Sequence, residues 1–90
     1  MENLIEYLPI GTIFMKDDSI LMYMITGYLY KDKDKKTYDY MAIPFPYGLM
    51  SMDVLNYFNH EDIKNIVFLG YKNEKFYKLN ERLNDIKETE

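Results

Sequence analysis

Short apolar and aromatic runs of strand length recur along residues 12–71, and in residues 38–43 successive side chains alternate with the period of two that β-strands have. Five segments carry the alternation or a short apolar run of strand length, and they are rich in β-branched and aromatic residues. They span residues 12–16, 20–30, 37–45, 53–58 and 65–71. The polar triplet Asp17–Ser19 separates the first two segments and predicts a hairpin turn.

The segment 20–30 is unusual because both of its alternating sets of residues are apolar. A strand of this kind needs cover on both faces. Gly27 has no side chain to pack, and an isolated glycine inside a strand commonly marks a bend or a bulge. The sequence therefore predicts a strand that bends near Gly27.

The third segment ends in Pro44 and Pro46, with Gly48 close behind. Proline cannot donate a ladder hydrogen bond, so it is confined to the edge or the end of a strand. The two prolines also lack the PxxP spacing of polyproline ligands. We therefore interpret residues 44–48 as the end of a strand and not as a recognition motif.

Two helical elements are expected. Asn59 can cap a single helical turn, and Asp62 stands at the capping-box position three residues later. From Asn73 or Glu74 onward, apolar residues recur at spacings of three and four, which predicts an amphipathic C-terminal helix. These apolar residues are Phe76, Leu79, Leu83 and Ile86. The tail beyond Ile86 is polar and is expected to fray.

Together these elements predict an α+β fold that is mainly β. We expect one domain over residues 1–90, with a β core at 8–72 and the helix with its tail at 73–90. Five short strands with a helical turn before the last one suggest a small, strongly bent antiparallel sheet, with an SH3-like barrel as one form of it. Whether the helix caps this sheet or binds another chain stays open.

Composition adds one anomaly to this picture. The chain has ten Tyr, five Phe and seven Met, and aromatic residues make up 17% of it. Tyrosine combines an apolar ring with a polar tip, so it suits half-buried and interfacial positions, and methionine gives a surface that can repack against a partner. Two readings remain: large side chains that fill a thin core, or a binding surface.

Charge and cysteine content narrow the function classes. The net charge of −4 argues against a nucleic-acid partner, and the mixed signs of residues 31–36 (KDKDKK) indicate a solvated turn. The absence of cysteine fits a reducing compartment. The N-terminus carries Glu2 and Glu6 where a secretory signal would carry basic residues, and the longest apolar run, Ile20–Ile25, is too short to cross a bilayer. We therefore expect a soluble cytoplasmic protein without membrane insertion.

No catalytic signature is visible in the sequence. His60 is the only histidine, and its neighbours Asn59, Glu61 and Asp62 point in different directions at the start of one helical turn, so a capping role is favoured over a metal site. Neither Ser19 nor Ser51 lies in an activating motif, and the isolated glycines form no phosphate-binding loop. We therefore predict no enzyme activity, no cofactor and no catalytic or metal-binding residue.

Five short motifs, taken together, give the sequence a family resemblance. They are an L-P-I-G opening, an I-x-G strand end, a D-Y strand leading to P-x-G, an F-N-H-x-D-I segment and an aromatic-Gly-Tyr close. In this chain they lie at residues 8–11, 25–27, 39–40 with 46–48, 58–63 and 70–71. Over about residues 8–72 the chain resembles the family of low-GC Gram-positive bacteria catalogued as domain of unknown function 4176. It departs from the pattern at Leu69, where a charged residue is expected, and in its C-terminal helix, which lies outside the shared region.

The resemblance implies a cytoplasmic accessory protein of type VII secretion, a chaperone or targeting adaptor for an LXG-type toxin or its small helical partner proteins. The candidate protein-contacting residues are Tyr28, Tyr30, Tyr38, Tyr40, Tyr47, Phe76, Tyr77 and Leu83. The alternative is a small barrel that binds a ligand or a nucleic acid. Pairing of two copies through an exposed sheet edge is a further open question.

Overall fold

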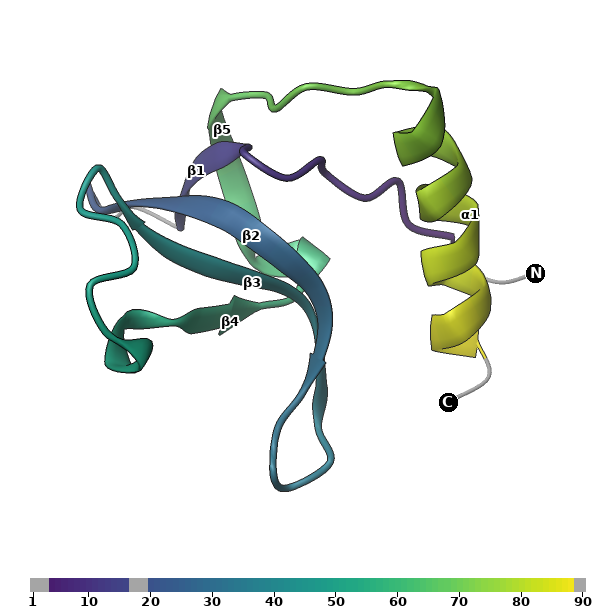
Figure 1. Ribbon diagram of the computed structural model, residues 1–90, viewed down its shortest axis with the longest axis horizontal. Coiled ribbons are helices and arrows are strands. Elements are labelled where there is room, and N and C mark those ends of the chain that lie inside the picture. Colours follow the sequence, from purple (N-terminus) through teal and green to yellow (C-terminus); the bar gives the residue numbers. More distant parts are fainter. Residues whose placement is uncertain (1–3, 17–19, 89–90) are drawn as a thin grey trace.

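The computed structural model describes residues 4–16 and 20–88 (Figure 1). Residues 1–3, 17–19 and 89–90 lie outside this description. The turn predicted at Asp17–Ser19, the acidic residue Glu2 and the last two residues of the polar tail fall in these gaps. Lys87, which was expected in the fraying tail, is helical, because the C-terminal helix continues to Glu88.

Five strands form one antiparallel sheet in the order β4-β3-β2-β1-β5. Their bounds are β1 Ile13–Lys16, β2 Met22–Lys31, β3 Thr37–Phe45, β4 Asn56–Phe58 and β5 Ile63–Phe68. Two 3₁₀ turns, η1 Met52–Val54 and η2 His60–Asp62, flank β4, and the helix α1 spans Glu74–Glu88. The predicted bent sheet, the helical turn before the last strand and the C-terminal helix are confirmed. The sheet is not closed into a barrel, since β4 and β5 stand at its two edges.

The bend predicted at Gly27 is confirmed. The register between β2 and β3 shifts between Ile25 and Gly27, and β2 curves strongly along its length (Figure 1). A Cβ on Gly27 would lie 2.7 Å from the Cε atom of Met41, so the Met41 methyl group occupies the space that a side chain at Gly27 would fill. Leu29 follows with a φ of 49°, a left-handed conformation that a leucine seldom adopts.

Two strand boundaries differ from the prediction. The strand expected at residues 53–58 begins only at Asn56, because the backbone N–H groups of Val54 and Leu55 donate to Ser51 and Met52 and form a 3₁₀ turn. Ser and Asp favour such local turns over a sheet ladder. The last strand runs over 63–68 and not 65–71, and Gly70 beyond it lies so close to the backbone of residues 10–12 that a Cβ would overlap it.

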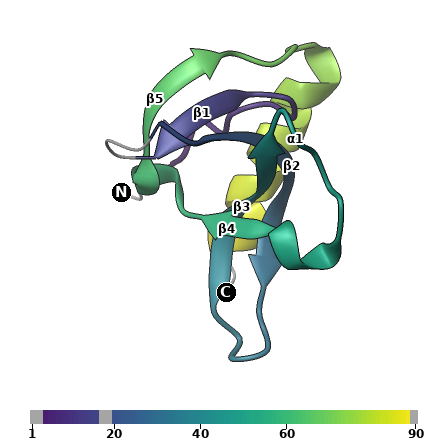
Figure 2. The ribbon, with the colours of Figure 1, turned by 90° about the vertical axis from the view of Figure 1, so that its left-hand side faces the viewer.

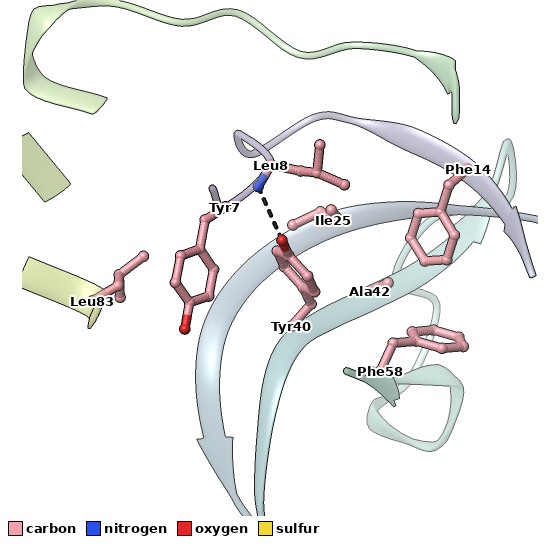
Figure 3. Close-up of a cluster of buried hydrophobic side chains, with 8 residues drawn as sticks. All are labelled: Tyr7, Leu8, Phe14, Ile25, Tyr40, Ala42, Phe58 and Leu83. Carbon is pink, nitrogen blue, oxygen red and sulfur yellow. Dashed lines mark hydrogen bonds between the residues drawn. The ribbon is translucent and has the colours of Figure 1, made fainter. Parts of the chain in front are cut away.

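The core fills the space between the bent sheet, the segment that precedes β1 and the helix (Figure 3). Its buried members come from the segment before β1, from four of the five strands and from α1. They are Tyr7, Leu8, Phe14, Ile25, Tyr40, Ala42, Phe58 and Leu83. In Figure 3 the Tyr7 ring lies between Leu83 of α1 and Tyr40 of β3. The N-terminal segment therefore mediates the contact between helix and sheet.

The helix α1 packs on its own chain through both apolar and polar contacts. Asn73 Oδ1 accepts the N–H of Phe76 at 2.8 Å and caps the first turn. Further along, the side chain of Asn84 pairs with both the N–H and the C=O of Ile5, each at 2.8 Å, and Asn80 Oδ1 accepts the N–H of Tyr7 at 2.7 Å. These bonds satisfy backbone groups of a segment that no strand pairs with. Within the described residues, no helix has the length and apolar character that crossing a membrane requires.

Candidate protein-binding surfaces

Three of the residues predicted to contact a partner lie in the interior. Tyr40 is fully buried, and Phe76 and Leu83 are 8% and 5% exposed. Tyr28 is half-buried, and its hydroxyl donates to the carbonyl oxygen of Leu8 at 2.7 Å. The side chains of Tyr40, Phe76 and Leu83 are therefore not accessible to a partner of the folded chain, because they are already buried within it.

The interior tyrosines form a connected aromatic cluster. Tyr7 packs against Tyr28 and Tyr40 with ring centroids 5.8 and 5.7 Å apart, in edge-to-face geometry. The Tyr40 hydroxyl accepts the N–H of Leu8 at 3.0 Å and lies 2.7 Å from Nδ1 of His60. Burial raises the pKa of Tyr28 to about 12, and it raises the pKa values of Tyr7 and Tyr40 as well.

A buried carboxylate lies next to this cluster. Asp39 is 3% exposed, and it accepts the backbone N–H of His60 at 2.8 Å and the ammonium group of Lys87 at 2.6 Å. The Tyr7 hydroxyl is buried and has no hydrogen-bond partner within the described part of the chain, and the charge of Asp39 adds to the effect of burial on its pKa. Asp39 therefore links α1, β3 and η2 through its two bonded partners.

His60 lies in the predicted capping turn. The capping box of Asn59 and Asp62 is present, with the Asn59 N–H donating to Asp62 Oδ2 at 2.9 Å. The hydrogen bond between the His60 ring and Tyr40 was not apparent from the sequence. Over residues 4–16 and 20–88, no three histidine or carboxylate side chains converge as a metal site would require.

Tyr30 and Tyr38 lie on the outside of the sheet and share a neighbour, Tyr57 of β4. The Tyr30 and Tyr57 rings stack with centroids 4.2 Å apart and planes 3° apart, and Tyr38 lies 5.7 Å from Tyr57. A hydrogen bond to Tyr30 raises the pKa of the Tyr57 hydroxyl. The Lys36 ammonium stands 5.3 Å from the Tyr38 ring. All three residues are half-buried.

Tyr47 and Tyr77 are the predicted contact residues with the largest exposure, at 72% and 54%. Tyr77 stands on the outer side of α1. Tyr47 follows β3 in a turn in which the Gly48 N–H donates to the Pro44 carbonyl at 2.8 Å, and Gly48 takes a φ of 79°. The prolines thus end the strand, as predicted, and direct Tyr47 outward.

An apolar pocket of about 280 Å³ opens beside Tyr47, and we call it the β2–β3 pocket. Its walls are residues 21–23, Pro44, Phe45, Tyr47, Val54 and Asn56. Two antiparallel pairs, Met22–Phe45 and Tyr23–Pro44, lie where β2 begins and β3 ends, and all four of their residues line the pocket. The nearby loop exposes Leu49, Met50 and Met52 to solvent.

The sequence contained a signal for this pocket that periodicity does not reveal. Across residues 41–58 the only charged residue is Asp53. A run this poor in charge, and rich in Met and aromatic side chains, is typical of the centre of a protein interface. The missed contact candidates are therefore Leu21, Phe45 and the exposed loop methionines.

The second apolar surface is the outer edge of β5. Ile66, Val67, Phe68 and the following Leu69 are each between 47% and 59% exposed. The ladder between β1 and β5 shifts register opposite Val67 and opposite Lys64, so the side chains of this edge do not alternate strictly between the two faces. We call residues 66–69 the β5 edge.

Comparison with known proteins gives one match. The family described as Domain of unknown function (DUF4176) matches residues 7–79, which covers the whole sheet and the start of α1 up to Leu79. No curated protein and no solved structure matches the chain. Since the match covers most of its length, the chain belongs to the DUF4176 family.

Proposed function

We propose that the chain is a non-enzymatic, protein-binding module that acts in the cytoplasm as a chaperone or targeting adaptor for an LXG-type toxin of a type VII secretion system. The toxin or one of its small helical partner proteins occupies the β2–β3 pocket. The observation that supports this most is the pocket itself: an apolar hollow walled by aromatic and Met side chains, next to a loop with exposed Leu49, Met50 and Met52.

Exposed apolar area of this kind stabilises a complex when a partner covers it. Burying one large apolar side chain is worth roughly 1.5 to 3 kcal/mol, and interfaces concentrate their binding energy in a few such anchors. Tyr47 and Phe45 flank the pocket and have few rotatable bonds, so ordering them costs little entropy. They are the expected anchors.

The chemistry of the pocket favours an amphipathic helix as the bound element. Helices dock into apolar grooves through residues spaced three and four apart, and Met side chains adapt to such partners. The neighbouring run of residues 41–58 carries only one charged residue, Asp53, so the partner face that fits it is mainly apolar.

The test is binding of the purified chain to the LXG domain of a toxin encoded beside its gene, measured by titration calorimetry. The variant Tyr47→Glu places a charge at the pocket mouth and should weaken binding by about tenfold or more. Tyr71→Glu, between β5 and α1, introduces the same charge at a similarly exposed tyrosine outside the pocket and serves as the matched control. Equal affinity of both variants and the parent chain would contradict the assignment of the pocket, and absence of any binding would contradict the role.

The stacked tyrosines favour a second candidate function, binding of single-stranded nucleic acid. Tyr30, Tyr38 and Tyr57 with Lys36 resemble a base-stacking platform beside a cation. The net charge of −4 opposes it. Fluorescence anisotropy with labelled oligonucleotides over a salt series distinguishes the two, because real phosphate contacts weaken steeply as salt rises.

A further inference from the structure

We infer that Met50 and Met52 are sites of reversible oxidation by a peroxide, and that their oxidation lowers the affinity of the β2–β3 pocket for its partner. The selectivity of the oxidation concerns the folded chain alone, whereas its effect on affinity rests on the proposed function. Figure 2 shows the connection between β3 and β4, which includes both residues and η1, curving away from the sheet.

These two methionines differ from the others in exposure. Met50 is 79% exposed and Met52 is 70% exposed. The other described methionines lie in strands and are half-buried, and they are Met15, Met22, Met24 and Met41. The methyl group of Met41, for example, occupies the space beside Gly27. A peroxide has to reach the thioether sulfur from water, so the sulfur atoms of the loop react first.

The chain offers a peroxide no thiol. It contains no cysteine, and cysteine thiolates are the groups on which such oxidants commonly act in proteins. The thioethers of methionine are therefore the only sulfur atoms in the chain. Exposure to solvent then decides which of them is oxidised, and the most exposed described ones stand side by side in one loop.

The oxidation transfers one oxygen atom to the Sδ atom of each residue. A sulfur lone pair attacks hydrogen peroxide, the S–O bond forms, the O–O bond breaks, and the peroxide is reduced to water while the thioether becomes a sulfoxide. In the reverse step the sulfoxide oxygen leaves as water, with two electrons and two protons from a dithiol that becomes a disulfide. Methionine sulfoxide reductases catalyse this return, so the modification is reversible.

The position of the loop makes its oxidation matter for binding. Met50 and Met52 lie in the chain between Tyr47 and Val54, and both of these residues line the β2–β3 pocket. A helix seated in the pocket lies against the loop, where the deformable apolar side chain of methionine adapts to it. A sulfoxide oxygen at this place gives up its hydrogen bonds to water and finds no donor on an apolar partner face. The oxidised chain therefore binds more weakly.

The first test measures the selectivity of oxidation. The purified chain is treated with hydrogen peroxide for a series of times, and the sulfoxide at each methionine is followed by peptide mapping and mass spectrometry. We expect Met50 and Met52 to react severalfold faster than the methionines of the strands, and this difference to vanish when the chain is unfolded in urea. Equal rates at all methionines of the folded chain would overturn the assignment of the site.

The second test measures affinity for the LXG domain by titration calorimetry. The chain is oxidised and freed of peroxide before mixing, so that the methionines of the partner stay reduced. We expect the dissociation constant to rise by about tenfold and to return after treatment with methionine sulfoxide reductases. The melting temperature of the oxidised chain should stay within about 4 °C of the reduced chain, because both side chains lie mostly in water.

The matched control is the chain that carries both Met50→Leu and Met52→Leu. Its affinity should be the same before and after peroxide, because it keeps only the methionines of lower exposure. An equal loss of affinity in this variant, or a melting temperature that falls together with the affinity, would overturn the role of the two residues. A reduced parent chain that binds and an oxidised one that binds equally well would overturn the regulation alone. A reduced parent chain that binds nothing would overturn the proposed function, and the regulation with it.

Discussion

Tyrosine occupies two contrasting regions of this molecule. Inside, Tyr7, Tyr28 and Tyr40 pack ring against ring, and the hydroxyls of Tyr28 and Tyr40 bond to the backbone of Leu8. Outside, Tyr47 shows most of its surface to solvent beside an apolar pocket. The comparison teaches that a small core can use tyrosine in place of Phe when the backbone of an unpaired segment supplies partners for the hydroxyl groups.

Substitution of an interior tyrosine should cost more stability than substitution of the exposed Tyr47. The largest effect is expected at Tyr40. Tyr40→Ala removes a fully buried ring and its contacts with Tyr7 and Tyr28, so we expect the free energy of unfolding to fall by about 3 to 5 kcal/mol. Urea denaturation followed by circular dichroism measures this loss. Tyr40→Phe keeps the ring and loses only the hydroxyl bonds to Leu8 and His60, so it should cost about 1 to 3 kcal/mol. If both variants cost the same, packing of the ring contributes little.

The ion pair beside the interior tyrosines should give the next largest effect. Lys87→Met leaves the buried carboxylate of Asp39 without its cation, so we expect the free energy of unfolding to fall by about 2 kcal/mol. The loss is no larger because the Lys87 side chain is 42% exposed, and solvent screens its charge. Asp39→Asn combined with Lys87→Met should cost less than the two single losses added together. Thermal and urea unfolding of the four chains form the cycle, and strict additivity would show that the two groups are not coupled.

Alkaline pH should lower the stability of the fold through the interior tyrosine Tyr28. The pKa of Tyr28 is raised from 10.0 to about 12 in the folded state, so the folded state favours the neutral phenol. The corresponding stability is fully present below about pH 10 and is lost as the pH rises towards 12. The melting temperature of the parent chain should therefore fall across this pH range. The melting temperature of Tyr28→Phe should fall less steeply. Parallel slopes for the two would contradict the burial of this hydroxyl.

The smallest effect on stability is expected at the surface. Tyr47→Ser removes a ring that is 72% exposed, so the free energy of unfolding should change by no more than about 0.5 kcal/mol. The same change should reduce binding of the partner at the β2–β3 pocket. A large loss of stability would mean that Tyr47 packs on its own chain, and it would remove the contrast with Tyr40.

Much of the fold could be predicted because it follows local rules. The alternation of residues 37–45, the glycine at the bend and the spacing of three and four in the C-terminal segment each identify an element from its own residues. The strand expected at 53–58 was shorter, because a 3₁₀ turn formed by Ser51 and Met52 competes with pairing at its start.

Which side of each element faces inward was harder to predict. In residues 20–30 both alternating sets are apolar, so the pattern could not tell that Tyr28 turns to the core. In the helix, Phe76 and Leu83 are buried while Leu79 and Ile86 are 37% and 41% exposed, although all four share the predicted apolar stripe. The asparagine contacts that dock α1 have no periodic signature at all, since they join a helix side chain to the backbone of a distant segment.

The pairing of Asn84 with Ile5 joins residues 79 positions apart in the sequence. During synthesis the early residues therefore wait, without their hydrogen-bonding partner, until the final helix has left the ribosome. Removing residues from either end of the chain would deprive the other end of these hydrogen bonds.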